Sequence, residues 1–324
     1  MINSIIKSQN PNLKLSILVP SYNDEAYIKQ CISSLLENDR NDFEVIVSDD
    51  CSDDSTISIL ESFKDERLIL VKSSTRLGSS NNWKKCLNLA RGDWIHFLAS
   101  DDYYSSGSVE NILDSLKDKN TVYLIKHLCF KDGHKEIFEV QCNPEKLKKI
   151  FNSIYKIDWS HLLKFSNHDE LVLTIFPRTK AKILSHISKY SVRSSFMYWV
   201  YAIFYHVNLA YINDGAVMKR YNHKIKRAKG GDLGKNKKNA LGLSFAGFYG
   251  DLYNSIIIPL YYRDPIMMFK LLTFSRYHST HKGGFYGLTY RKKSHFHPGP
   301  LVNLFLSPIL IAAKNLNLHK KFKA

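Results

Sequence analysis

Three short clusters of polar residues, each directly after an apolar run, carry the side chains best suited to chemistry. They are "PSYND" at 20–24, "SDDCSDD" at 48–54 and "ASDD" at 99–102. Adjacent carboxylates such as Asp101 and Asp102 repel each other unless water or a cation neutralises them. The pair is therefore either a solvated turn or part of a site where a divalent metal ion lies between the chain and a ligand.

The apolar runs before these clusters have the length and composition of buried strands. "LSILV", "FEVIVSDD", "RLILV" and "DWIHFL" follow one another along the chain, as expected of strands covered on both faces. Helical patterns at 23–39, 53–63 and 79–92 separate them. This alternation predicts an α/β fold with a Rossmann-like, mostly parallel sheet flanked by helices.

The expected sheet also predicts where the polar clusters lie. Ligands of such sheets bind beyond the carboxyl ends of the strands, so the three clusters should meet on one rim. At the helix ends, we expect Ser52 or Asp53 to cap the second helix and Gly92 to end the third.

After residue 105 the pattern is less regular. "TVYLIKHLCFKDGHKEIFEV" indicates two strands joined at an Asp-Gly turn, "PEKLKKIFNS" a helix, and "SSFMYWVYAIFYHVNLAYI" a buried helix running into a strand. Apolar stretches such as "LVNLFLSPILIAA" are shorter than the roughly 20 residues that span a bilayer. The N-terminus has no signal-peptide pattern, and we expect a chain that does not cross a membrane.

Three motifs together resemble a known enzyme family. "SILVPSYNDEAYIKQCISSLL", "FEVIVSDDCSDDST" and "ARGDWIHFLASDD", in this order and spacing, resemble the nucleotide-binding half of family 2 glycosyltransferases of the GT-A fold. The resemblance covers about residues 13–115 and is loose beyond them. It implies an inverting hexosyltransferase of the bacterial surface-polysaccharide type. Its donor would be a nucleoside-diphosphate sugar, most simply a UDP-sugar, and its acceptor a saccharide or a lipid-linked sugar.

The resemblance assigns the metal and diphosphate contacts. By the family pattern Asp102 ligates Mn²⁺ or Mg²⁺, and Asp101 lies against the ribose and the sugar. Arg220 and His223 stand where related enzymes carry a phosphate or metal contact on a flexible loop. The alternative is that these two residues are solvated members of a cationic run.

The resemblance also assigns a pocket for the nucleotide. Asp50 would accept the uracil N–H, and Pro20 and Tyr22 would pack against the base. Arg76 and Gly78 lie in the stretch that usually lines this pocket.

Other polar residues in the motifs have structural roles in our interpretation. Asp49, Asp53 and Asp54 are typical turn and cap formers. Tyr103 and Tyr104 are expected to be wall or packing residues.

Inversion requires a general base, and at the position where the family carries it this sequence differs from the family pattern. Where the family carries an acidic pair, "SSFMYW" has Ser194 and Ser195, and serine needs an activating group to act as a base. Asp169 and Glu170 form the nearest acidic pair upstream, with His168 beside them. We predict that this pair is catalytic. The alternatives are a strand-capping role, a base elsewhere in the chain, and a protein that no longer turns over.

The charge of the chain is concentrated at one end. Residues 215–324 hold 20 Lys and Arg against three acids, whereas the first 214 residues are nearly neutral. We therefore divide the chain into a catalytic, nucleotide-sugar-binding domain at 1–218 and a basic, aromatic-rich region at 219–324, a loop with amphipathic helices. Such a region suits an anionic membrane surface, and its alternative is a helical subdomain with a basic exterior.

Three other function classes remain as alternatives. A nucleic-acid-binding protein would explain the basic region, but not the acidic strand ends, which repel phosphate without a metal. A sugar nucleotidyltransferase would carry a glycine-rich, basic signature that "VPSYNDEAY" lacks. A non-catalytic nucleotide-sugar-binding protein would explain the missing acids.

The cysteines indicate the cellular setting. The five cysteines include no CxxC pair, which favours a reduced, cytoplasmic setting. Together with the basic region, this leads us to expect an enzyme that is peripheral at the inner face of the membrane.

Overall fold

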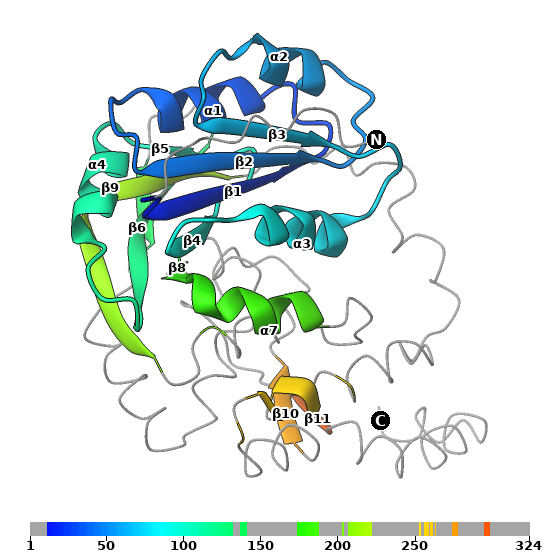
Figure 1. Cartoon of the computed structure of the whole chain (residues 1–324), viewed down its shortest axis with the longest axis vertical. Helices are drawn as coiled ribbons and strands as arrows, with labels where there is room; N and C mark the ends of the chain where they lie inside the picture. The colour runs from blue at the N-terminus through cyan, green and yellow to red at the C-terminus, as the bar shows by residue number, and fades with distance from the viewer. Residues whose placement is uncertain are drawn as a thin grey trace, which may run out of the picture.

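The computed structural model describes residues 12–131, 137–140, 174–187 and 207–221, with shorter pieces at 203, 253, 256–258, 260–261, 263, 274–277 and 295–298. Figure 1 shows a curled sheet in this part of the chain, with α1 and α2 on one face and α3 and α7 on the other. The arrangement confirms the predicted α/β class.

The first half of the sheet follows the predicted alternation. Strands β3, β2, β1 and β4 lie in that order and are all parallel. Their bounds are β1 Leu15–Ser21, β2 Phe43–Asp49, β3 Leu68–Lys72 and β4 Trp94–Phe97, and the connecting helices are α1 Ile28–Leu36, α2 Thr56–Ser62 and α3 Ser79–Leu89. Parallel pairing brings the carboxyl ends of these strands to the same edge.

The second half of the sheet is mixed. The order continues as β8, β6, β9 and β5, with β7 beside β6. β8 is antiparallel to both β4 and β6, whereas β6 and β9 are parallel. The bounds are β5 Tyr103–Tyr104, β6 Thr121–Lys131, β7 Ile137–Val140, β8 Thr174–Pro177 and β9 Asn208–Tyr221. The pairing of β6 with β7 confirms the two predicted strands.

Shorter elements complete the described part. Helix α4, Ser108–Ser115, packs against β9, and the turn η2, Arg178–Lys180, leads into α7, Ala181–His186. A separate two-stranded sheet pairs β10, Phe274–Tyr277, with β11, His295–Pro298. β9 runs through residue 218, where we expected the domain boundary. None of the helices in the described ranges is long and apolar enough to cross a bilayer.

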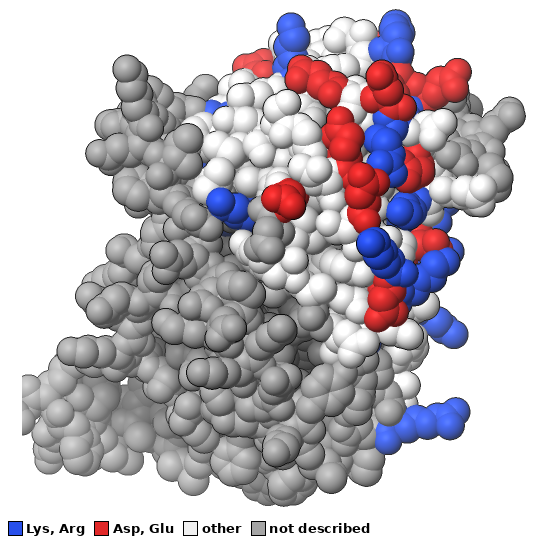
Figure 2. Space-filling model, turned by 90° about the vertical axis from the view of Figure 1, so that its left-hand side faces the viewer, with Lys and Arg blue, Asp and Glu red and all other residues white. Residues whose placement is uncertain are grey.

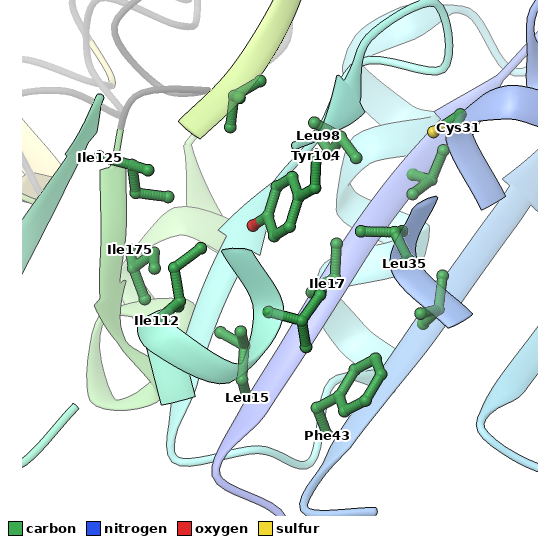
Figure 3. Close-up of a cluster of buried hydrophobic side chains, with 14 of the residues drawn as sticks. Leu15, Ile17, Cys31, Leu35, Phe43, Leu98, Tyr104, Ile112, Ile125 and Ile175 are labelled. Carbon is green, nitrogen blue, oxygen red and sulfur yellow. The ribbon is translucent and has the colours of Figure 1, made fainter. Parts of the chain in front are cut away.

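The core explains why these residues form these elements. β1 and β2 are buried on both faces, as unbroken apolar runs predict. Helix α1 buries Ile28, Cys31, Ile32 and Leu35, which lie three or four residues apart on one face. Figure 3 shows Leu35 from α1 and Ile112 from α4 in one cluster with the sheet residue Ile17. Each such buried side chain stabilises the fold by roughly 1.5–3 kcal/mol.

Two predicted helix ends are wrong. Helix α2 begins at Thr56, whose N–H donates to Asp54 Oδ1 at 2.9 Å, so neither Ser52 nor Asp53 caps it.

The second wrong prediction is the end of α3. Helix α3 ends at Leu89, three residues before Gly92. A Cβ at Gly92 would lie 2.6 Å from the Leu15 carbonyl carbon, so the glycine is needed for close approach to β1.

Candidate active site

The three polar clusters meet on one rim, as predicted. Asp50 N–H donates to the Ser21 carbonyl at 2.9 Å, which joins the first cluster to the second. The Ser100 hydroxyl donates to Asp24 Oδ2 at 2.5 Å, which joins the third cluster to the first. Pro20 lies opposite Ser48 in the register of β1 and β2. Side chains from all three clusters therefore face the same edge of the sheet.

Tyr22 and Arg76, both predicted to line the nucleotide pocket, contact each other. The guanidinium carbon of Arg76 lies 3.7 Å from the centre of the Tyr22 ring, a cation–π contact. Arg76 is exposed and Tyr22 is half-buried. Together they form an aromatic and cationic surface suited to stacking on a flat base.

Asp50 holds the loop that carries Arg76. Its buried carboxylate accepts N–H groups from Leu77 at 2.6 Å and from Gly78 at 2.9 Å. Gly78 has φ +80°, a backbone conformation that favours glycine. A carboxylate accepts up to about four hydrogen bonds, so Asp50 retains capacity for a ligand N–H. Its assignment to uracil stays a prediction.

The acid turn, residues Ala99–Asp102, follows β4. Asp102 is 3% exposed, its N–H donates to the Ala99 carbonyl at 3.0 Å, and its Oδ1 accepts the Arg220 N–H at 2.8 Å. Asp101 is half-buried beside it. The turn therefore holds two carboxylates in fixed positions at the rim.

Asp24 is a site residue that the sequence analysis missed. Its Oδ2 accepts the Ser21 hydroxyl at 3.2 Å and the Tyr22 N–H at 3.0 Å, in addition to Ser100. Burial raises the pKa of the Asp24 carboxyl, while the hydrogen bond from Ser100 acts in the opposite direction. The Ser-x-x-Asp spacing of Ser21 and Asp24 is typical of a turn closed by a side chain, and was the available signal.

Arg220 lies at the acid turn, but not as an extended arm. Its Nη2 donates to Gln30 Oε1 at 2.7 Å, and its guanidinium carbon lies 4.5 Å from the centre of the Tyr27 ring and 4.8 Å from that of Phe130. The residue is 8% exposed. The expected loop contact is thus a buried side chain at the end of β9.

Several predicted roles fall outside the described residues. These are the acidic pair Asp169 and Glu170 with His168, the serines Ser194 and Ser195, and the loop residue His223.

The polar residues with expected structural roles do make structural contacts. Asp49 accepts the Ser52 N–H at 2.9 Å, and Asp53 accepts the Asn23 amide at 2.6 Å.

The two tyrosines after the acid turn pack as expected. The Tyr104 hydroxyl bonds to His96 Nδ1 in the core, and burial raises the pKa of Tyr104. Tyr103 packs edge-on against Phe130, with ring centres 5.3 Å apart. These contacts confirm the packing interpretation.

The acid turn fits one type of metal site. Within the described ranges no group of three or more His, Cys, Asp or Glu could hold an ion by itself. Mg²⁺ and similar ions are commonly held by one or two carboxylates, with substrate phosphates and water completing the shell. Asp101 and Asp102 supply this donor set, so the turn fits an ion that arrives with a diphosphate.

Comparisons with known proteins bear on the same residues. Residues 16–169 match the family described as Glycosyl transferase family 2. An uncharacterized glycosyltransferase of Haemophilus influenzae is 31% identical over 172 residues, 52% of this chain and 64% of that protein. The poly(ribitol-phosphate) beta-N-acetylglucosaminyltransferase TarS of Staphylococcus aureus is 34% identical over 120 residues, 35% of this chain and 21% of TarS. The chain therefore spans only part of the length of these relatives.

A solved structure shares the fold. The crystal structure of S. aureus TarS 1–349 in complex with UDP-GlcNAc matches with a TM-score of 0.53 and 18% identity, covering 76% of this chain and 67% of that chain. This likeness confirms the GT-A fold. Most of the rim, from Pro20 to Asp102, lies within the residues that the family matches. Residues 16–169 are therefore similar to glycosyl transferase family 2, and the relatives matched over this part of the chain are glycosyltransferases.

Proposed function

We propose that the chain transfers a sugar, with inversion, from a nucleoside-diphosphate donor to a saccharide or lipid-linked acceptor in polysaccharide synthesis. The observation that carries this proposal is the hydrogen-bonded rim. One edge of the sheet holds the Tyr22–Arg76 surface and the acid turn, joined through Ser21, Asp24 and Ser100. A donor that has a base at one end and a diphosphate at the other requires both features on one edge.

The donor is a UDP-sugar in this proposal. The base stacks on Tyr22, and the Asp50 carboxylate accepts an N–H from the uracil while it holds the loop of Arg76. The similarity to TarS, solved with UDP-GlcNAc, supports this choice of nucleotide. Asp101 lies against the ribose and the sugar.

The acid turn would hold Mn²⁺ or Mg²⁺ through Asp102, together with the phosphate oxygens of the donor. Such an ion supplies Lewis-acid stabilisation of the charge on the leaving diphosphate. The backbone N–H of Arg220 donates to Asp102 Oδ1 at 2.8 Å, which anchors this oxygen of the carboxylate. His223 remains a proposed contact to the metal or the phosphate.

Inversion requires a base that removes the proton of the acceptor hydroxyl. Asp169 and Glu170 are the proposed pair, on the sequence argument alone. If they have this role, Asp169→Asn or Glu170→Gln lowers turnover more than nucleotide affinity.

We further propose that the protein is cytoplasmic and peripheral at the inner face of the membrane. The support is the concentration of positive charge in residues 215–324, 20 Lys and Arg against three acids. Figure 2 shows acidic and basic side chains interleaved on one face of the described part, without a patch of a single sign. In this proposal, electrostatic attraction to anionic lipid comes from the basic C-terminal region.

The proposed activity is tested by incubating the protein with a panel of UDP-sugars, Mn²⁺ and candidate acceptors. Release of UDP and formation of a glycoside are followed, and NMR of the product gives its anomeric configuration. We expect one donor to be consumed with inversion, and Asp102→Asn to release no UDP. Equal turnover by Asp102→Asn, or a product of retained configuration, contradicts the proposal.

A further inference from the structure

Arg220 contacts the acid turn through both its backbone and its side chain. Its N–H donates to Asp102 Oδ1 at 2.8 Å, and its Nε donates to the Asp101 carbonyl at 3.0 Å. Arg220 is the last residue but one of β9, more than a hundred positions along the chain from the acid turn. The end of β9 is therefore fastened to both residues of the acidic pair.

The guanidinium is held on its other side by helix α1 and strand β6. Its Nη2 donates to Gln30 Oε1 at 2.7 Å, and the rings of Tyr27 and Phe130 lie within 5 Å of its central carbon. A planar fork can serve two acceptors from different elements at once, which a lysine ammonium on a flexible stem cannot reproduce. Burial of a cation is tolerated where such contacts replace its water.

We infer that Arg220 is a positioning residue for the acidic pair, and not a phosphate contact. Its backbone N–H anchors the Oδ1 oxygen of Asp102, a contact that every side-chain variant of Arg220 keeps. Its side chain fixes the Asp101 carbonyl and, with it, the peptide that joins the two aspartates. The inference rests on the proposed function, since it assumes that the acid turn holds a metal ion with the donor.

The two roles predict different measurements. A group that orients a metal ligand acts on metal affinity, and loss of such a partner typically reduces that affinity about 10- to 100-fold. A group that contacts the diphosphate acts on nucleotide affinity even when the metal is saturating. Titrating UDP at a series of Mn²⁺ concentrations measures two quantities. One is the Mn²⁺ concentration that gives half-maximal UDP binding, and the other is the UDP affinity at saturating Mn²⁺.

The experiment uses the full chain and three variants of this cluster. Arg220→Lys keeps the charge and loses the fork, Arg220→Met removes both, and Gln30→Ala removes one acceptor at an exposed position where folding is not at risk. Arg91→Lys is the matched control, because Arg91 pairs with buried Glu44 at the opposite edge of the sheet. Circular dichroism and thermal melting establish that each variant is folded.

We expect Arg220→Lys to raise the Mn²⁺ requirement about 10-fold, Arg220→Met to raise it further, and Gln30→Ala to raise it less. UDP affinity at saturating Mn²⁺ stays at the wild-type value in all three, and Arg91→Lys changes neither quantity. An unchanged Mn²⁺ requirement in the Arg220 variants overturns the inference, as does weaker UDP binding at saturating metal, which identifies a direct phosphate contact. If the wild-type protein itself shows no metal-dependent binding of UDP, the proposed function fails, and the inference fails with it.

Discussion

At the scale of single residues, Asp50 does more than a base contact requires. Its carboxylate serves two backbone N–H groups, those of Leu77 and Gly78. Asp50→Asn leaves one acceptor oxygen and turns an NH₂ group toward the second N–H. We expect it to lower the free energy of unfolding by about 1–3 kcal/mol, the usual penalty for a buried group without a partner. It should also weaken UDP binding, because the loop of Arg76 is released.

Chemical denaturation and UDP titration measure the two effects of Asp50→Asn. Asp53→Asn is the control, because Asp53 is exposed and its bond to Asn23 lies at the surface. Wild-type stability in Asp50→Asn would contradict a structural role for this carboxylate.

Lys180 gives the fold a dependence on pH. Burial lowers its pKa to about 8 from the ordinary 10.5. Between these values the unfolded chain binds a proton that the folded protein has lost, so stability rises with pH in this window. Lys180→Met should remove this rise, which amounts to about 3 kcal/mol across the window at 1.36 kcal/mol per pKa unit.

Unfolding free energies of wild type and Lys180→Met, measured from pH 7 to pH 11, test this prediction. Lys182→Met is the control, because Lys182 is exposed and lies two residues further along the chain. Parallel curves for wild type and Lys180→Met would show that the lysine titrates normally.

At the scale of elements, the parallel half of the sheet could be predicted because unbroken apolar runs and helical patterns are local signals. The mixed half could not be predicted in this way. β8 has only four residues, and its pairing with β4 and β6 joins segments some 50 to 80 positions apart, which a short apolar run does not specify. The residues of the candidate site fall into the same two groups.

The strand-end clusters could be predicted because they are local in the sequence. Arg220 could not, because it is one cation within a basic run, and its hydrogen-bond partner Gln30 lies 190 positions away.

The approach of the chain after α3 to β1 depends on Gly92. A Cβ there would lie 2.6 Å from backbone atoms of Leu15 and Ser16, which cannot rotate away. We expect Gly92→Ala to lower the free energy of unfolding by about 1–3 kcal/mol or more, as overpacking in a core does. Gly107→Ala is the control, because Gly107 has φ +73° with open space around it and loses only about 1–2 kcal/mol from backbone strain. A smaller loss at Gly92 than at Gly107 would contradict the close-packing account.

At the scale of the whole molecule, charge separates the chain into a nearly neutral part and a basic end. Deleting residues 301–324 removes four lysines and the apolar stretch "LVNLFLSPILIAA". We expect weaker binding to anionic vesicles, by about 1 kcal/mol for each lysine near the surface, and little change with neutral vesicles. Flotation with vesicles at low and high salt measures this effect. Equal binding by the full and the shortened chain would contradict peripheral attachment through this end.

We propose that the acid turn binds a nucleoside diphosphate together with a divalent ion. Calorimetric titration with UDP, with and without Mn²⁺, tests it on the wild-type protein and on Asp102→Asn. The variant keeps an oxygen that can accept the Arg220 N–H, so it is expected to fold. We expect wild type to bind UDP only weakly without Mn²⁺ and tightly with it, and Asp102→Asn to lose this gain. Equal binding with and without the ion, or an undiminished gain in Asp102→Asn, would contradict the claim.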